Sequence, residues 1–274
     1  MAKATGRTDK QAEKQRQREL QRRADLIRQQ TATRRRRFRL GGGVAAVLLL
    51  IGAVAVAMHG YGSTTPTSAV AATLGAPTGA TPPTPTGQFH KVGSVLRQGG
   101  KAEFVFFGAL YCPHCAVERW AIVKSLSQFG RFSHMSSTTN GQGVPTFDLT
   151  HATFQSKYVS FEARDMQDQS GNTLQALSAD QQSLFRQYDP TGGIPLVAVG
   201  GYAMSGSPIL PDEISGRPFN AVQSALKHNV SDNFVQDINA EANVLTALIC
   251  HADGMQPQAP CGRSVIRHLV ASVR

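Results

Sequence analysis

The chain has 274 residues and a formal net charge of +10, which at first suggests a nucleic-acid or anionic-surface partner. However, residues 1–39 hold 14 of the 28 Lys and Arg and only 4 of the 18 Asp and Glu. The rest of the chain carries 14 charges of each sign, so its net charge gives it no reason to bind nucleic acid. The length allows one sizeable domain with extensions.

An apolar segment follows this basic tail directly. Residues 40–58 are 19 consecutive uncharged residues, which as a helix would extend about 28 Å, close to the hydrocarbon thickness of a bilayer. An arginine cluster at 34–39 precedes the segment, and no charged residue follows it before Lys91. The positive-inside rule therefore predicts a transmembrane helix with a cytoplasmic tail and an extracytoplasmic remainder. Small-x-small motifs at 53–57 leave a cleaved signal peptide open, but the long charged leader favours an uncleaved anchor.

The next segment has the composition of a linker. Residues 59–88 are rich in Gly, Ser, Thr, Ala and Pro and contain no Lys, Arg, Asp or Glu. As a flexible coil this linker would reach about 30 Å. The remaining residues, 89–274, are enough for a domain with a single core.

Strand and helix patterns alternate within residues 89–274. Residues 104–110 form a continuous apolar run, typical of a strand buried on both faces, and residues 117–130 have apolar positions at helical spacing. The later predicted elements are a strand, a helix, a strand pair and three helices, at 157–166, 173–188, 194–206, 218–229, 233–250 and 262–274. This alternation predicts an α/β fold.

Two cysteines, Cys112 and Cys115, lie between the first predicted strand and the first predicted helix. A redox cysteine needs a lowered pKa because only the thiolate attacks a disulfide, and the positive end of a helix dipole supplies it. Pro113 has no N–H to donate and fits the first helical turn. The imidazole of His114 would stabilise the reduced form, which makes the disulfide a better oxidant. The motif therefore predicts Cys112 as the nucleophile and Cys115 as the resolving thiol.

The string YCPHC between a strand and a helix resembles the active site of the thioredoxin superfamily, and CPHC is similar to the tetrapeptide of the periplasmic disulfide oxidases related to DsbA. The longer string GALYCPHCAVERWAIVKSLSQFG resembles a bacterial and archaeal family of membrane-anchored thioredoxin-like proteins of unknown function. A second segment, YDPTGGIPLVAVGG, resembles the superfamily's cis-proline loop. The resemblance to the superfamily covers about residues 89–227. It implies that Pro195 lies beside the disulfide and that Ile194 pairs with the substrate backbone. A competing segment for this role is 144–147.

The chain departs from the family pattern at two places. The superfamily carries a buried acidic residue six positions before the first cysteine, where this chain has Phe106. Glu118, one helical turn after Cys115, is a weak substitute as proton acceptor. The long interval before Pro195 also implies inserted elements, including the helix at 173–188, which would either shape a substrate groove or only pad the fold. We expect Arg119 to be solvated or paired on the helix surface.

The other two cysteines, Cys250 and Cys261, have ten residues between them. Four cysteines on the exported side favour disulfides over zinc thiolates. We expect Cys250 and Cys261 to form a structural disulfide that joins the last helix to the preceding one, worth about 3 kcal/mol. The alternative is a relay that passes electrons to the first pair.

These features predict a membrane-anchored, extracytoplasmic thiol–disulfide oxidoreductase, an oxidase acting on exported proteins. We expect no cofactor and no metal, since the two sulfurs carry the electrons, and a membrane-bound redox partner. Four alternatives stay open: a zinc site completed by Cys250, His251 and Cys261, a permanent disulfide at the first pair, a non-catalytic envelope scaffold, and a nucleic-acid binder acting through residues 1–39.

Overall fold

The structure, a computed structural model, describes residues 74–79, 89–229 and 231–273. The predicted tail at 1–39 and the apolar segment at 40–58 lie outside these residues, so both stay predictions. Among the helices of the described ranges, none combines the length and the apolar character needed to cross a bilayer.

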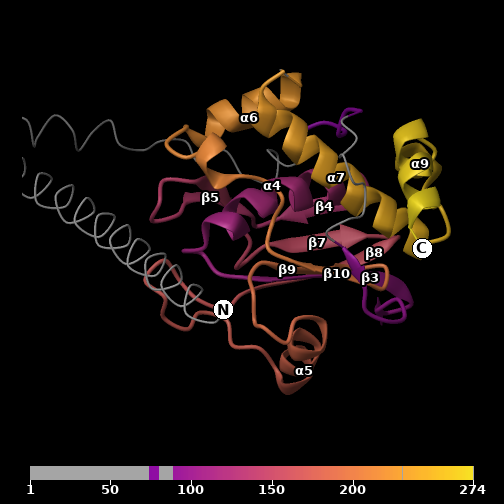
Figure 1. Cartoon of the computed structure of the whole chain (residues 1–274), viewed down its shortest axis with the longest axis horizontal. Coiled ribbons are helices and arrows are strands. Elements are labelled where there is room, and N and C mark those ends of the chain that lie inside the picture. The colour runs from indigo at the N-terminus through magenta and orange to yellow at the C-terminus, as the bar shows by residue number, and fades with distance from the viewer. Residues whose placement is uncertain (1–73, 80–88, 230, 274) are drawn as a thin grey trace, which may run out of the picture. The chain divides into compact units, whose positions relative to one another are not determined.

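A mixed sheet of six strands forms the centre of the domain (Figure 1). Its middle strand, β3 (Lys101–Gly108), pairs in parallel with β8 (Val159–Asp165) on one side and antiparallel with β9 (Leu196–Val199) on the other. The other strands pair antiparallel, β10 with β9, β1 with β10 and β2 with the start of β3, and they span Tyr202–Ser205, His90–Lys91 and Arg97–Gln98. The predicted α/β class is therefore confirmed as a mixed sheet with helices.

Strand β3 is buried on both faces, as its apolar run predicts. Phe104 and Phe106 join the larger core cluster, and Val105 and Phe107 join a second, smaller cluster. This division follows from the two-residue period of a strand, which sends neighbouring side chains to opposite faces. All four side chains are at most 1% exposed.

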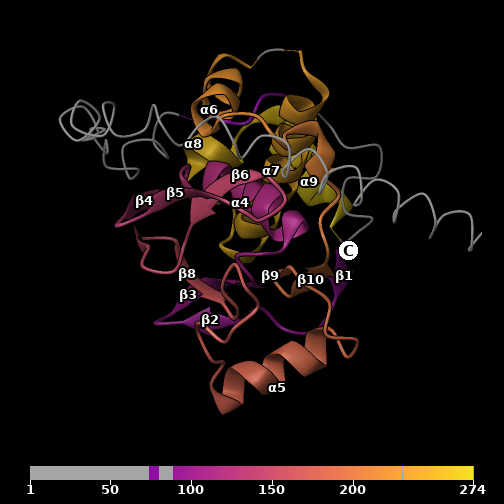
Figure 2. The same ribbon diagram turned by 90° about the vertical axis from the view of Figure 1, so that its left-hand side faces the viewer.

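Helices cover both faces of this sheet (Figure 2). Helices α4 (Pro113–Leu126) and α7 (Asn233–Ala252) pack against each other on the face of the sheet that contributes to the larger core cluster. On the opposite face α5 (Ala179–Tyr188) packs its apolar side on the smaller cluster, with the ring centroids of Phe107 and Phe185 6.0 Å apart. The helix predicted at 173–188 therefore begins only at Ala179, and it covers the second face of the sheet.

Four short strands between α4 and β8 were not predicted from the sequence. They form two antiparallel pairs, β4 with β7 and β5 with β6, and span Gly130–Ser133, Thr153–Ser156, Ser136–Thr139 and Pro145–Asp148. The indole nitrogen of Trp120 donates to the carbonyl oxygen of Pro145 at 2.9 Å, which fixes β6 on α4. These strands, as well as α5, account for the long interval between the cysteines and Pro195.

The remaining helices follow β10. They are η1, α6, α8 and α9, which span Pro211–Glu213, Phe219–His228, Gln258–Cys261 and Ser264–Ser272. Asn229 caps the C-terminus of helix α6, and its φ of 49° is the left-handed conformation common at helix ends.

Residues 74–79 pack on the domain, although the sequence places them in a flexible linker. The side chain of Leu74 is fully buried in the larger cluster. Three side chains donate to carbonyl oxygens of this segment, Lys124 to Leu74, Asn243 to Thr78 and Arg263 to Pro77, at 2.8, 2.8 and 2.6 Å. The prediction that 59–88 forms one free linker is therefore wrong for residues 74–79, because an apolar side chain and buried donors hold them.

Candidate active site: a dithiol at the start of helix α4

Cys112 caps the N-terminus of α4. Its backbone is extended (φ −74°, ψ 121°), and Pro113 occupies the first helical turn. The Sγ atom of Cys112 accepts a hydrogen bond from the backbone N–H of Cys115 at 3.2 Å. This N–H is one of the donors that a helix start leaves without a partner, so the sulfur takes the place of the usual capping oxygen.

The two sulfurs differ in access. Cys112 keeps 6% of its surface exposed, whereas Cys115 has none. Neighbouring Tyr111 and His114 are exposed on the surface beside the pair. The small exposed area of Cys112 therefore leaves its sulfur accessible to another protein, whereas the sulfur of Cys115 is inaccessible.

The pKa values of the two thiols move in opposite directions. The hydrogen bond between the thiols lowers the pKa of Cys112 most; the backbone N–H groups of Cys115 and His114 and the charge of Arg119 lower it further. Burial opposes these effects, and the resulting pKa is about 7. Burial first, and then the hydrogen bond to Cys112, raise the pKa of Cys115 well above its usual value. Cys112 is thus the thiol that ionises near neutrality.

His114 supports this thiolate through its main chain. Its backbone N–H contributes to the lowered pKa of Cys112, while its side chain is exposed to solvent. A direct role of the imidazole in tuning the pair stays a prediction.

The loop before Pro195 lies against the dithiol. The carbonyl oxygen of Ile194 is 3.9 Å from the Sγ of Cys112, and Ile194 itself is half-buried. The peptide bond between Ile194 and Pro195 is cis. Residues 145–147 of the competing segment instead lie in β6, which packs on α4. The structure therefore brings Cys112, Ile194 and Pro195 together.

The carboxylate of Asp189 holds this loop in place, a role that sequence reasoning missed. Its two oxygens accept hydrogen bonds from the backbone N–H groups of Thr191 and Gly193 at 2.8 and 2.6 Å, and from the hydroxyls of Thr191 and Ser205. Burial raises the pKa of Asp189, but these hydrogen bonds outweigh it and lower the pKa to about 2. The signal was present in the Asp-Pro-Thr-Gly turn sequence, since Asp side chains commonly organise such turns.

A buried ion pair lies under the dithiol, and it too was missed. Arg119 and Asp165 are both buried and joined by a short contact from Nη2 to Oδ1. The expectation that Arg119 is solvated or paired on the helix surface is therefore wrong. Asp165 ends β8, and Arg119 lies one turn after Cys115, so the two elements bring the charges together beneath the sulfurs.

Phe106 fills the strand position where the family resemblance implies an acid, and it is fully buried. A methyl group at Gly108 would lie 2.6 Å from the Phe106 ring and 3.1 Å from the Sγ of Cys115. The absence of a side chain at Gly108 therefore leaves room for both the Phe106 ring and the Cys115 sulfur. At position 106, β3 therefore carries a phenyl ring and not a carboxyl group.

Two buried carboxyl groups lie between α4 and α7. Glu118 accepts a hydrogen bond from the Ser207 hydroxyl at 2.7 Å, and burial raises the pKa of Glu118 to about 7. Burial, and next the nearby charge of Glu118, raise the pKa of Glu241 well above its usual value. Glu118 thus has the pKa of a proton acceptor, but no contact between it and Cys115 supports that role.

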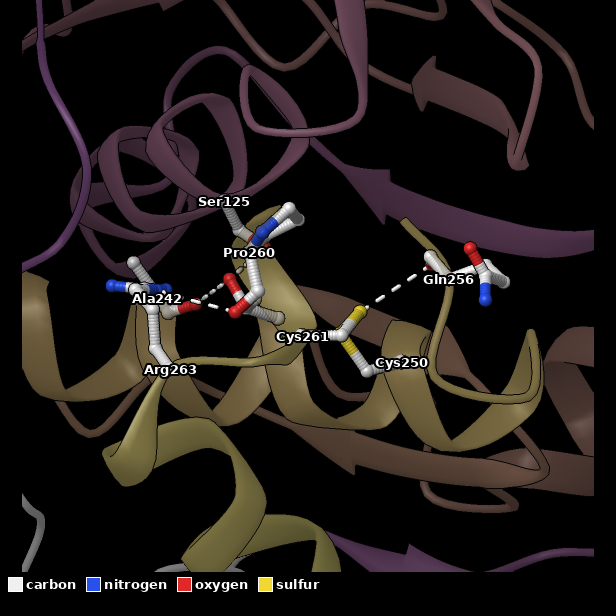
Figure 3. Close-up of a disulfide and its surroundings, with 8 residues drawn as sticks. Ser125, Ala242, Cys250, Gln256, Pro260, Cys261 and Arg263 are labelled. Carbon is white, nitrogen blue, oxygen red and sulfur yellow. Dashed lines mark hydrogen bonds between the residues drawn. A yellow bond between two sulfur atoms is a disulfide. The ribbon is translucent and has the colours of Figure 1, made fainter. Parts of the chain in front are cut away.

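Cys250 and Cys261 form a disulfide (Figure 3), which joins α7 to the short helix α8 and not, as predicted, to the last helix α9. Both residues are fully buried. Helices α4 and α7 run in the same direction, because Glu118 lies near Glu241 and Ser125 hydrogen-bonds Thr246 further along both. The dithiol at the start of α4 and the disulfide at the end of α7 therefore lie at opposite ends of the helix pair, which gives no support to the relay.

The described ranges contain no cluster of three or more His, Cys, Asp or Glu that could hold a metal ion. The zinc alternative also loses two of its ligands, because Cys250 and Cys261 are bonded to each other.

Fold and site together define an α/β protein with a dithiol at a helix N-terminus and a proline loop beside it. Residues 88–196 match a family described as a domain of unknown function, DUF929. This match covers less than half of the chain and includes both the dithiol and Pro195. No curated protein and no solved structure matches the chain.

Proposed function

We propose that this protein is a thioredoxin-like, membrane-anchored thiol–disulfide oxidoreductase that oxidises exported proteins. The observation that carries the proposal is the position of Cys112, whose slightly exposed sulfur caps α4 beside the loop of Ile194 and Pro195. A thiolate at a helix start with a pKa near 7 has the properties of a redox-active cysteine, and a sealed partner thiol suits the resolving role.

The sheet supports the thioredoxin-like assignment. The strand order β8, β3, β9, β10, with one parallel and two antiparallel pairings, puts the strand that leads to the dithiol beside the strand that follows the proline loop, as the resemblance to the thioredoxin active site requires. Helices α4 and α7 on one face and α5 on the other complete it. The dithiol follows the central strand β3, and the proline loop leads into β9.

The proposed reaction transfers two electrons from a substrate dithiol to the disulfide form of the pair. A substrate thiolate attacks the Sγ of Cys112, the bond to Cys115 breaks, and the sulfur of Cys115 leaves and takes up a proton. The second substrate thiolate then attacks the substrate sulfur of the mixed disulfide, and Cys112 leaves as a thiolate. The substrate gains a disulfide, and one proton passes to solvent. A disulfide of a membrane-bound partner accepts the two electrons in the return step.

The loop at Ile194 would hold the substrate during this reaction. The backbone of Ile194 lies beside Cys112 at the surface, where an extended substrate segment could pair with it as an added strand. The proposed extracytoplasmic location rests on the charge pattern of residues 1–58 and agrees with the disulfide of Cys250 and Cys261, which forms readily in an oxidising compartment.

Trapping of mixed disulfides tests the proposal. The full chain with Cys115→Ala should accumulate exported proteins bound through Cys112, because the resolving thiol is absent. Cys112→Ala and the double variant are the matched controls and should trap nothing. If Cys115→Ala traps no partner, and the potential of the wild-type pair lies below about −300 mV, the pair is a structural disulfide.

A second candidate function is a non-catalytic envelope scaffold. Phe106 favours it, because the strand position under the dithiol holds a phenyl ring in place of an acid. This candidate predicts that partner proteins bind equally well to the wild type and to a variant that lacks both Cys112 and Cys115.

A further inference from the structure

The guanidinium group of Arg119 occupies the buried space under the dithiol. Arg119 lies four residues after Cys115 on α4, so both side chains lie on the same face of the helix, one turn apart. Its Nη2 donates to the carbonyl oxygen of Ala109, on the segment between β3 and the dithiol, at 3.2 Å. Its carbon Cζ lies 5.2 Å from the centre of the Phe106 ring, whose edge shares the space beside Gly108 with the Cys115 sulfur. The guanidinium group is therefore held against Ala109 and Phe106, two residues that adjoin the dithiol.

The charge of this group is only partly satisfied. Nη2 makes the contacts to Ala109 and Asp165, while Nε and Nη1 are buried with no hydrogen-bond partner in the described ranges. One oxygen of Asp165, Oδ2, is likewise buried and without a partner. A buried ion pair of this kind contributes little net stability, since desolvation of the two charges offsets their attraction. Its position under the sulfurs calls for a different role.

We propose that Arg119 sets the reduction potential of the Cys112–Cys115 pair by stabilising the thiolate of the reduced form, and that Asp165 limits this effect. This inference rests on the proposed redox function. When the disulfide accepts two electrons, negative charge appears on Cys112, and a buried cation stabilises that charge more strongly than one in water. The charge of Arg119 lowers the pKa of both thiols. Arg119 acts as a positioning residue, since it does not exchange bonds with substrate.

The two partners of the ion pair must then act with opposite signs. Loss of the Arg119 charge destabilises the thiolate, so the pKa of Cys112 rises and the disulfide becomes a weaker oxidant. Loss of the Asp165 charge removes a nearby negative group and leaves Arg119 uncompensated, so the pKa of Cys112 falls and the disulfide becomes a stronger oxidant. A purely structural ion pair predicts the same direction for both variants, because each breaks the same contact.

The experiment measures the pKa of Cys112 and the glutathione redox equilibrium in full-length Arg119→Met and Asp165→Asn variants purified in detergent. Arg119→Met should raise the pKa by about one unit and shift the equilibrium about tenfold toward the disulfide, whereas Asp165→Asn should shift both the opposite way. Arg119→Lys, which can keep the charge but not all the contacts of the guanidinium group, should shift both values in the same direction as Arg119→Met but by less. Arg164→Met is the matched control, since Arg164 pairs with Glu162 near the surface of the same strand and should change neither value.

Shifts of the same sign in the two variants, or no shift in either, would overturn the role of Arg119. If Arg119→Met does not fold, the double variant Arg119→Met with Asp165→Asn replaces it and should still raise the pKa of Cys112. The proposed function fails separately: in that case the wild-type pair does not exchange with glutathione at all, while alkylation still reports the pKa of Cys112 in each variant.

Discussion

The carbonyl oxygen of Ile194 lies 3.9 Å from the Sγ of Cys112, although 82 residues separate them in the sequence. The contact exists because β3 and β9 are antiparallel, hydrogen-bonded neighbours. The segment that follows β3 and the loop that precedes β9 therefore meet at the same end of these two strands. The thiol with the lowered pKa and the backbone that we propose binds a substrate strand thus lie side by side.

Asp189 should control reactions with protein substrates more than reactions with small reagents. Asp189→Asn weakens the acceptor for Thr191, Gly193 and Ser205, so the loop that carries Ile194 loses its fixed position. We expect the exchange rate with a reduced unfolded protein to fall about ten- to a hundredfold, while alkylation of Cys112 by iodoacetamide changes less than about twofold. Stopped-flow kinetics and alkylation rates measure the two effects. Asp180→Asn, on the exposed start of α5, is the control, and equal losses in both assays would contradict the prediction.

The buried carboxyl of Glu118 should make the fold less stable as the pH rises. Burial raises its pKa to about 7, so the folded state binds a proton that the unfolded state has already released above about pH 4.5. The free energy of unfolding should therefore fall by about 3 kcal/mol between about pH 4.5 and 7 on account of Glu118 alone, and buried Glu241, whose pKa is raised well above its usual value, should add to the fall. Urea unfolding across this range measures it. Glu118→Gln should make the fall smaller, because only Glu241 is left to cause it, whereas Glu162→Gln on the partly exposed face of β8 should leave the profile unchanged; a flat wild-type profile is the contradicting result.

Residues 74–79 should contribute to the stability of the domain. Leu74→Ala removes a fully buried side chain, so we expect a loss of about 2–4 kcal/mol in the free energy of unfolding. Thr78→Ala removes a hydroxyl that hydrogen-bonds Asn229 and Asn239 at the surface, with an expected loss of about 1 kcal/mol. Chemical denaturation followed by fluorescence of Trp120 measures both. A Leu74→Ala variant as stable as the wild type would show that this segment does not pack on the domain.

The disulfide of Cys250 and Cys261 should stabilise the fold without taking part in the reaction. Replacement of both cysteines by Ser should lower the free energy of unfolding by about 3 kcal/mol, because the unfolded chain loses a short closed loop. The redox equilibrium of Cys112 and Cys115 with glutathione should stay unchanged. A shifted equilibrium in this variant would instead support the relay.

The main elements of the sheet could be predicted because their patterns are local. The apolar run of β3, the Gly200–Gly201 turn between β9 and β10, and the helical spacing in α4 and α7 all appear within short windows. The strands β4 to β7 could not, since each has four residues of which at most one, a Phe, is a large apolar residue, so neither an apolar run nor an alternation emerges.

The candidate site was predictable only in part. The position of Cys112 and Cys115 at the start of a helix could be predicted, because the strand pattern, the two cysteines and the helical spacing are adjacent in the sequence. Arg119 and Asp165 are 46 residues apart, and charged residues are almost never fully buried unless paired, so the sequence favours a surface position for Arg119. The packing of Leu74 on the domain could not be predicted for a similar reason. Its partner Lys124 is far away in the sequence, and the residues around Leu74 have the composition of a linker.

The pH dependence of Cys112 alkylation tests the central claim most directly. Wild-type protein, reduced and reacted with iodoacetamide over pH 5–10, can be mapped by mass spectrometry so that each cysteine is followed separately. The account predicts that the reaction rate at Cys112 rises with a midpoint near pH 7, while Cys115 stays unreactive until far higher pH. A midpoint at about 8.5, the value of an ordinary free thiol, would contradict it.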